Sequence, residues 1–223
     1  MQHKKIKIIV SSQQKTKILM ITNREEVIDK AFKVFLKMNY EKASISTLAK
    51  ACGLAKTGIV YYFPHKLELF MAVADKFFIH LQDPANKFDT PADTLAEFIE
   101  QYVAGVSKAM DGIVSLVNDG NNPYDCCPNF YYIHFLSQVR MYYPGIRQKL
   151  EDIFSKDYDM WTAVIQRAKD NGEIRSDVDV TTTARMFRQI FYGISYEHAF
   201  LNVLDTDELK ENFKYLYSLL KQE

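Results

Sequence analysis

The sequence has few of the residues that cross-link or interrupt a chain. Its 223 residues include three cysteines, eight glycines and six prolines. Three cysteines cannot form a paired disulfide framework, and so few glycines and prolines favour long helices over a turn-rich β protein. No apolar run is long enough to span a bilayer, and no signal-peptide pattern is evident. We therefore expect an all-α protein in a reducing cytoplasm, without membrane association.

Patterns for catalysis or for metal binding are also missing. We find no glycine-rich phosphate loop, no nucleophile elbow and no cluster of residues with metal-ligand spacing. Cys126 and Cys127 are adjacent, but no histidine or third cysteine near them completes a tetrahedral zinc site, which leaves a thiol-sensing loop as the alternative. Cys52 occupies an apolar position typical of a small core residue. We expect neither catalytic nor metal-ligating residues, and no cofactor.

The formal net charge is zero, but the two signs are separated along the chain. Residues 1–82 contain 14 Lys and Arg against 6 Asp and Glu, whereas residues 83–223 contain 14 against 22. A basic head on an acidic body is either a solvated surface or the electrostatic footprint of a nucleic-acid-binding domain. The motif in this head favours nucleic acid.

A helix-turn-helix is predicted over residues 44–66. Ser44 can cap a first helix whose apolar positions follow the helical period, and Gly53 can adopt the left-handed conformation that ends it. In the short second helix, Ile59 and Phe63 are spaced to face the protein. The side chains expected outside are Lys56, Thr57, Tyr61 and Tyr62. Basic and hydroxylic groups on an exposed helix suit phosphates and base edges.

Periodic apolar positions predict the remaining helices. A first helix starts after Thr22 or Asn23 and ends at Asn39, which we expect in a left-handed conformation. Further helices are predicted over residues 66–82, from Thr90-Pro91 to about 110, and over 130–143, 146–169, 179–203 and 206–221, with a loop at 119–128. The resulting domains are a flexible tail at 1–21, a helix-turn-helix domain at 22–66, a connecting helix at 67–82 and a helical body at 83–223.

The head resembles the tetracycline-repressor (TetR) family of transcriptional regulators. The resemblance rests on Ala31-Phe32 with Phe35, on Ser44 with Leu48-Ala49, and on Gly53-Leu54 followed by the run from Tyr61 to Leu69. It spans Val27 to Val73, about a fifth of the chain. It implies a repressor that binds a palindromic DNA operator as a homodimer joined by its last two helices, and that a small molecule in the body releases.

The resemblance also implies which residues contact DNA. The backbone-phosphate contacts fall on Ser44, Ser46 and Thr47, the base-reading positions on Lys56, Thr57 and Gly58, and further backbone or base contacts on Tyr61, Tyr62 and Lys66. The sequence departs from the family pattern at Ala55, Gly58 and Val60, where a capping hydroxyl, a Thr or Asn, and a phosphate-contacting Tyr are common. These departures leave the operator sequence open.

A ligand pocket and a dimer interface in the body follow from the same resemblance. The side chains expected around the pocket are Tyr102, Met110, Tyr131, His134, Phe135, Trp161, Phe187, Phe191 and Tyr192, although aromatic residues at helical spacing are also typical of plain core packing. The expected interface residues are Ile194, His198, Leu201, Leu209, Phe213, Leu216 and Leu220. The last helix is apolar on more than one side, so these leucines could instead pack within their own subunit.

One alternative function remains for this sequence. A helix-turn-helix can lose operator binding and ligand control and serve as a protein-interaction module. The basic head argues against this alternative, because binding to a protein does not require an excess of positive charge.

Overall fold

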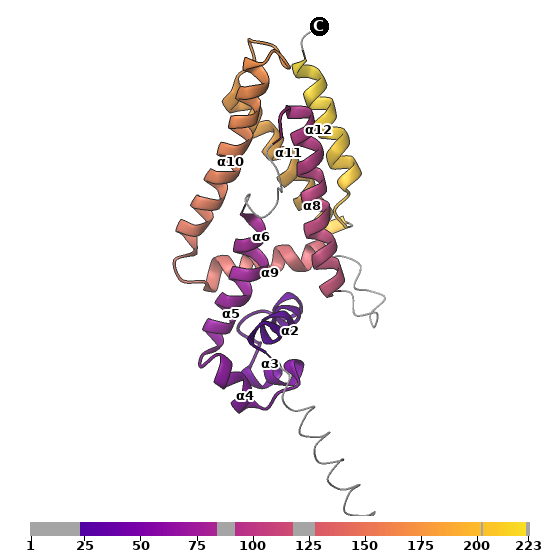
Figure 1. Ribbon diagram of the computed structural model, residues 1–223. Helices are drawn as coiled ribbons and strands as arrows, with labels where there is room; N and C mark the ends of the chain where they lie inside the picture. The colour runs from indigo at the N-terminus through magenta and orange to yellow at the C-terminus, as the bar shows by residue number, and fades with distance from the viewer. Residues whose placement is uncertain (1–22, 84–91, 118–127, 202, 222–223) are drawn as a thin grey trace, which may run out of the picture.

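The computed structural model describes residues 23–83, 92–117, 128–201 and 203–221, and within these residues the chain is helical, without a β-strand. A small head made of the first helices lies at one end of the elongated molecule, and a bundle of longer helices forms the body at the other end (Figure 1). The all-α expectation is confirmed. The predicted tail at 1–21 and the Cys126-Cys127 pair lie outside the described residues.

Three helices form the head: α2 (Arg24–Lys37), α3 (Ile45–Cys52) and α4 (Lys56–Tyr62). Asn23 caps α2, because its side-chain oxygen accepts a hydrogen bond from the Glu26 amide at 2.8 Å. The predicted end of this helix was wrong. It ends at Lys37, and no residue other than glycine has a positive φ among those described. The Asn39 side chain instead accepts the Lys42 amide at 3.1 Å, which stabilises the following turn.

The helix-turn-helix has the predicted local structure. Ser44 Oγ accepts the Thr47 amide at 3.1 Å, and Gly53 ends α3 with φ 71°, a conformation that residues with a Cβ rarely adopt. In α4, Ile59 is fully buried, and Phe63 is buried directly after its end. These two side chains fix α4 against the rest of the head.

A continuous helical segment connects head and body, as predicted for residues 66–82. It consists of α5 (Lys66–Ala74), the π-helical turn η1 (Asp75–Ile79) and α6 (His80–Gln82). The π-helical turn was not predicted. At its centre the Phe77 ring stacks on Phe32 of α2, with centroids 3.9 Å apart, and the Phe77 carbonyl accepts the Tyr132 hydroxyl at 3.1 Å.

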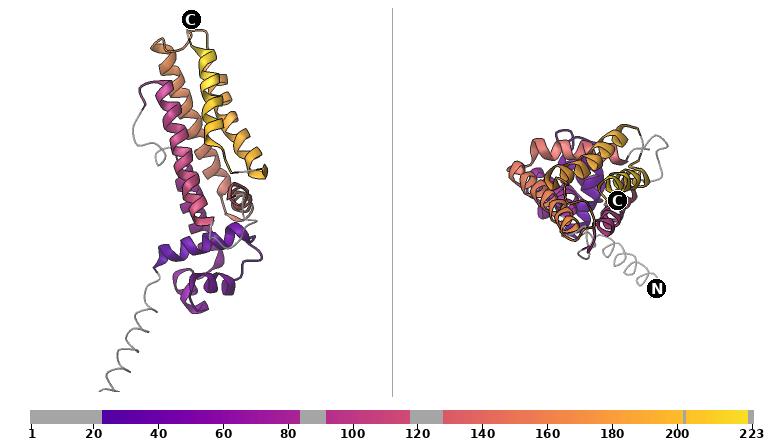
Figure 2. Two further views of the ribbon diagram at one scale, coloured as in Figure 1. Left: turned by 90° about the vertical axis from the view of Figure 1, so that its right-hand side faces the viewer. Right: turned by 90° about the horizontal axis from the view of Figure 1, so that it is seen from above.

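The body contains α8 (Leu95–Val117), α9 (Pro128–Tyr142), α10 (Ile146–Asp170), α11 (Val180–Leu201) and α12 (Thr206–Leu220). Helices α8, α10, α11 and α12 extend away from the head, whereas α9 lies across the end of the bundle beside the head (Figures 1 and 2). Thr90-Pro91 lies outside the described residues. The helix that we expected from there begins at Leu95, where Thr94 Oγ1 accepts the Glu97 amide at 3.1 Å.

Aromatic side chains from four helices fill the centre of the body. Trp161 of α10 has no exposed surface, and its ring lies 4.8 Å from Phe98, 4.7 Å from Phe187 and 5.4 Å from Phe213. These contacts join α10 to α8, α11 and α12. In the described part of the chain, no helix is long and apolar enough to cross a membrane, and no group of three or more His, Cys, Asp or Glu could hold a metal ion.

The last helix packs mainly within its own subunit, and four of the expected interface residues lie on its packed side. Its apolar residues Leu209, Phe213, Leu216 and Leu220 are at most 8% exposed and belong to the core of a single chain. Their expected place between subunits stays a prediction. The opposite side of α12 exposes Tyr215 and Leu219.

Leu209→Ala should therefore lower the free energy of unfolding by about 2–5 kcal/mol, because it leaves a cavity in a packed core. Urea denaturation at one fixed protein concentration measures this loss. Glu211→Ala on the exposed side of α12 is the matched control and should change stability by less than about 0.5 kcal/mol. Equal effects of the two substitutions would contradict the placement of Leu209.

Candidate nucleic-acid interface and effector cavity

The second helix of the helix-turn-helix lies at the end of the head that is farthest from the body (Figure 1). Of its predicted contact residues, Lys56, Thr57 and Tyr61 are exposed, and Tyr61 is 82% exposed. The Tyr62 ring is half-buried and packs edge-on against Tyr61, with centroids 5.2 Å apart. The exposed side of α4 thus presents an ammonium group, a hydroxyl group and a phenol to solvent.

The hydroxyl groups at the start of α3 have different roles. Ser44 Oγ caps the helix and lies 2.9 Å from Thr47 Oγ1, so these two hydroxyls bond to each other. Ser46 is exposed beside them. The main role of Ser44 is therefore to stabilise the helix that carries Ser46 and Thr47.

Gly58 is half-buried in α4 on the side that faces Leu54. A Cβ added at Gly58 would lie 3.5 Å from the Leu54 Cβ, which is ordinary van der Waals contact. Its φ is not positive either, so neither backbone conformation nor packing requires a glycine there. The absence of a side chain at this position leaves open surface on α4.

Lys66 differs from the other predicted contacts because its ammonium group is already bound within the head. Lys66 Nζ donates to the Tyr40 carbonyl at 2.8 Å and lies 4.2 Å from the centre of the Tyr40 ring. This joins the start of the connecting helix to the turn between α2 and α3. The residue has a structural role that the sequence pattern did not indicate.

Not every basic residue of the head is available to a phosphate. Lys30 pairs with Glu26 at 2.6 Å, and Lys76 pairs with Glu25 and Asp29. Lys50 and Lys56, by contrast, are exposed, and no ion pair to them occurs among the described residues. These two lysines lie on the helices of the helix-turn-helix itself.

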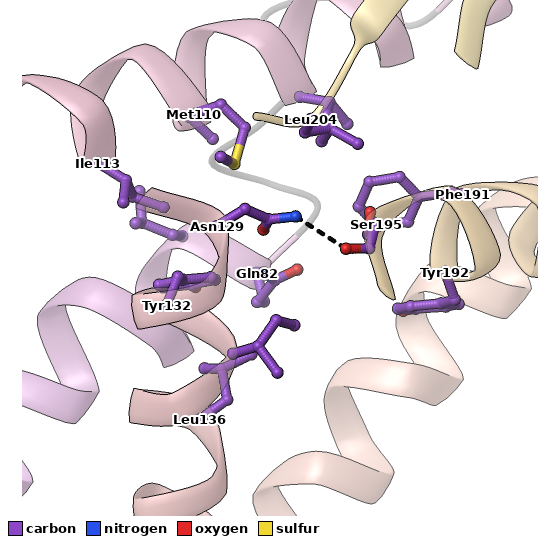
Figure 3. A pocket seen from close by; sticks show the side chains of 14 residues that line it. Gln82, Met110, Ile113, Asn129, Tyr132, Leu136, Phe191, Tyr192, Ser195 and Leu204 are labelled. Carbon is purple, nitrogen blue, oxygen red and sulfur yellow. Dashed lines mark hydrogen bonds between the residues drawn. The ribbon is translucent and has the colours of Figure 1, made fainter. Parts of the chain in front are cut away.

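A second candidate site is a cavity of about 110 Å³ in the body, next to the end of the connecting helix (Figure 3). Helices α6, α8, α9 and α11 contribute its walls. The lining residues are Leu81, Gln82, Val106, Ala109, Met110, Ile113, Asn129, Tyr132, Ile133, Leu136, Phe191, Tyr192, Ser195 and Leu204. Three of the nine predicted pocket residues are among them: Met110, Phe191 and Tyr192.

The other six predicted pocket residues do not line this cavity. Tyr102, Trp161 and Phe187 belong to the buried aromatic centre of the body. Phe135 packs between Phe32 and Phe70 at the junction with the head, Tyr131 packs against Phe130, and His134 Nδ1 lies 3.2 Å from Gln138 Nε2. The resemblance indicated α8, α9 and α11 correctly, but it included Trp161 of α10, omitted α6, and did not indicate which side of each helix faces the cavity.

Apart from Tyr192, the polar residues of the cavity were missed. Asn129, only 3% exposed, donates from Nδ2 to the Ser195 carbonyl at 2.8 Å, which joins α9 to α11 (Figure 3). Ser195 Oγ is buried and has no hydrogen-bond partner among the described residues. Burial raises the pKa of Tyr132 to about 12, and burial together with the nearby Asp157 carboxylate raises the pKa of Tyr192 to about 12. Both phenols are therefore neutral at physiological pH.

Exposed apolar side chains on α11 and α12 form a third feature, which we call the α11/α12 face. It consists of Tyr196, Phe200 and Leu201 of α11 and Tyr215 and Leu219 of α12, each at least 50% exposed. Leu201 is the one predicted interface residue among them.

The remaining predicted interface residues on α11 are largely covered by their own chain. Ile194 is half-buried. The His198 ring is 9% exposed, and its Nδ1 accepts the Asp205 amide at 3.1 Å. His198 Nε2 lies 3.1 Å from the Glu208 carboxylate. Thus His198 joins α11 to α12 within one subunit, and its expected place between subunits stays a prediction.

Comparison with known proteins finds a family model that matches the head and solved structures that share the fold. Residues 27–73 match the family model of bacterial regulatory proteins, tetR family. Over 102 residues the chain is 26% identical to the uncharacterized HTH-type transcriptional regulator YuxN of Bacillus subtilis (strain 168), and the alignment covers 44% of this chain. That alignment spans only 35% of the length of YuxN.

Two solved structures share the fold over most of both chains. The TetR-family regulator PfmR of Thermus thermophilus superposes with a TM-score of 0.62 at 16% identity, over 88% of this chain and 98% of PfmR. SmeT of Stenotrophomonas maltophilia, in a complex with triclosan, superposes with a TM-score of 0.58 at 14% identity, over 90% of this chain and 92% of SmeT.

The bonds of Lys66 predict that it stabilises the head. Lys66→Ala should lower the free energy of unfolding by about 1–2 kcal/mol, because the Tyr40 carbonyl loses a charged donor and the Tyr40 ring loses a cation. Thermal unfolding followed by circular dichroism measures the change. Lys42→Ala, an exposed lysine in the same turn, is the control, and an equal shift for both variants would refute the role of Lys66.

Proposed function

We propose that this chain is a TetR-family transcriptional regulator, a repressor that binds a palindromic operator as a homodimer and is released by a small-molecule effector. Its head matches the tetR-family model, and its described body has the fold of solved TetR-family regulators. One observation carries this proposal. A single helical segment begins in the DNA-facing head and ends in the wall of the cavity.

DNA contacts are proposed for the exposed residues of the helix-turn-helix. Lys56, Thr57 and Tyr61 stand on the outer side of α4, and Ser46 and Lys50 are exposed on α3. Ammonium groups attract phosphates, and hydroxyl and phenol groups can bond to phosphates or base edges in the major groove. In a dimer, two such helices enter successive major grooves when they are about 34–36 Å apart or a multiple of that distance.

The α11/α12 face supports the homodimer. Three aromatic and two leucine side chains on two consecutive helices are exposed, and Tyr196 packs edge-on against Phe200 with ring centroids 5.1 Å apart. A second copy that presents the same face would bury them symmetrically. We assign the interface to this face rather than to the buried leucines of α12.

Effector control is proposed to act through α6 and α9. Leu81 and Gln82 of α6 and Asn129 and Tyr132 of α9 line the cavity. Farther along α9, the buried Gln138 donates from Nε2 to the Phe35 carbonyl of the head at 3.0 Å and accepts the Tyr40 amide. A ligand that moves these walls therefore also moves the contacts that position the head.

The coupling between effector and DNA is reciprocal. If the effector prefers a body shape in which the two heads no longer fit successive grooves, it weakens DNA binding by the same factor by which DNA weakens effector binding. The complex of SmeT with triclosan supports the idea that a protein of this fold accepts a small molecule.

Selection from random duplex DNA tests the central proposal. The full-length protein should enrich a palindromic sequence, and the enriched duplex should bind two chains. Enrichment of no sequence would contradict operator binding and favour a protein-interaction module instead.

Lys56→Ala should weaken binding to the selected duplex and reduce its salt dependence. Removing one ammonium–phosphate pair from each subunit makes the slope of log K against log salt concentration less steep by about 0.9 per subunit. Fluorescence anisotropy between 50 and 200 mM salt, roughly the range in which such pairs matter, measures the slope. Lys108→Ala, an exposed lysine of α8, is the control. An unchanged slope for Lys56→Ala would exclude a phosphate contact.

Leu219→Ala should weaken the dimer about ten-fold or more while the fold is retained, because both subunits lose apolar surface at a symmetric interface. Sedimentation equilibrium over a dilution series measures the dissociation constant. Met141→Ala removes an equally apolar, 70% exposed side chain from α9 and should leave the dimer unchanged. A dimer that tolerates Leu219→Ala as well as Met141→Ala would place the interface elsewhere.

A further inference from the structure

The wall of the effector cavity carries no formal charge on any of its 14 described lining residues. Nine of them have aliphatic, methionine or phenylalanine side chains. The two phenols of the wall, Tyr132 and Tyr192, are neutral at physiological pH, as tyrosines ordinarily are, and burial raises their pKa values further, to about 12. Burying an ion against such a wall removes its hydration without supplying a counter-charge. The wall therefore selects against charged ligands.

Among the described residues, the charged groups next to the cavity wall are already paired or line a separate groove. Arg188 lies 5.7 Å from the Tyr192 ring, but its Nε donates to the Asp157 carboxylate at 2.7 Å. His80 and Lys108 line a separate groove that shares only Leu81, Ala109 and Ile113 with the cavity. Neither set of side chains supplies a counter-ion to the cavity interior.

One polar patch interrupts the apolar wall. Asn129 is held in place by its hydrogen bond to the Ser195 carbonyl, and Ser195 Oγ beside it is buried without a partner among the described residues. A buried hydroxyl group without a partner is unfavourable, and a ligand atom that bonds to it removes this cost. A hydroxyl group can donate or accept, so the bonding partner is a neutral polar group of either kind. Figure 3 shows Asn129, Gln82 and Ser195 projecting between the apolar residues.

The size of the cavity limits the ligand. Its volume of about 110 Å³ is close to that of engineered apolar cavities of about 150 Å³, which bind benzene. Met110 is the flexible residue of the wall and can adapt to a ligand of different shape. A single ring or a short chain therefore fits without a large rearrangement.

We propose that the effector is an uncharged, mainly apolar molecule of about one ring, whose single neutral hydrogen-bonding group binds Ser195 Oγ beside Asn129. This inference rests on the proposed function only in calling the ligand an effector. The chemical selectivity of the cavity can be tested without DNA.

Three ligands of nearly equal shape separate the contributions of charge, hydrogen bonding and apolar contact: benzyl alcohol, ethylbenzene and benzoate. Isothermal titration calorimetry with the full-length protein measures each affinity. Benzyl alcohol should bind at least about ten-fold more tightly than benzoate, because the carboxylate loses hydration without gaining a partner. Benzoate binding as tightly as benzyl alcohol, or no binding of any of the three at millimolar concentration, would overturn the proposal.

Ser195→Ala removes the hydroxyl group and retains the helix. It should weaken benzyl alcohol binding by roughly three- to ten-fold, the range of one neutral hydrogen bond, and leave ethylbenzene binding within about two-fold. Ser137→Ala, which removes an exposed hydroxyl group from α9, should change neither affinity. Equal benzyl alcohol binding by the wild type and Ser195→Ala would overturn the assignment of Ser195.

A separate measurement distinguishes this inference from the proposed function. The anisotropy of the selected duplex bound to the wild-type protein is followed while benzyl alcohol is added. Binding with the predicted selectivity but without release of DNA supports the ligand class and contradicts effector control. Release by benzoate but not by benzyl alcohol contradicts the ligand class and leaves effector control intact.

Discussion

The position of the head relative to the body depends on Phe77. Its ring stacks on Phe32 of the head at 3.9 Å, and its carbonyl accepts the hydroxyl group of Tyr132 from the body. Both partners are buried, so each contact excludes water and favours a single geometry. This contact therefore fixes the direction in which the connecting helix leaves the head, and the contacts of Phe135 and Gln138 with the head act together with it.

Helix α9 completes the same constraint from the side of the body. Its first half contributes Asn129 and Tyr132 to the cavity, and its second half holds the head through Gln138. Because a helix moves nearly as a rigid rod, a displacement at one of its ends is felt at the other. The cavity and the head are thus connected twice, through the connecting helix and through α9, and the two connections meet at Tyr132 and Phe77.

Much of the fold could be predicted because local rules and tertiary packing agree there. Ser44, Gly53 and Ile59 each fulfil a requirement that can be recognised within a few residues: a cap, a left-handed turn and a buried position. Asn39 shows where such a rule fails. An asparagine after a helix can either adopt a left-handed conformation or bond through its side chain to a following amide, and the sequence does not distinguish the two. In this structure Asn39 bonds to the Lys42 amide.

The candidate sites were harder to predict, since a helix with several apolar sides does not reveal which side faces a neighbour, a cavity or a second subunit. Leu209 and Leu219 lie on one helix and are both leucines, yet the first is fully buried and the second half exposed. Asn129 and Ser195 form no recognisable motif, because they come together only when α9 and α11 pack. The available signal was the presence of small polar residues within apolar helices.

The π-helical turn has a consequence for the phase of the connecting helix. A turn of this kind takes up about one residue more than an α-helical turn, and each residue of an α-helix advances the azimuth by about 100°. If residues 75–79 were ordinary α-helix, Leu81 and Gln82 would point about a quarter of a turn away from their present direction while Leu69 and Phe70 stayed in the head. The wide turn therefore acts as an angular spacer, which lets one helix face two different partners at its two ends.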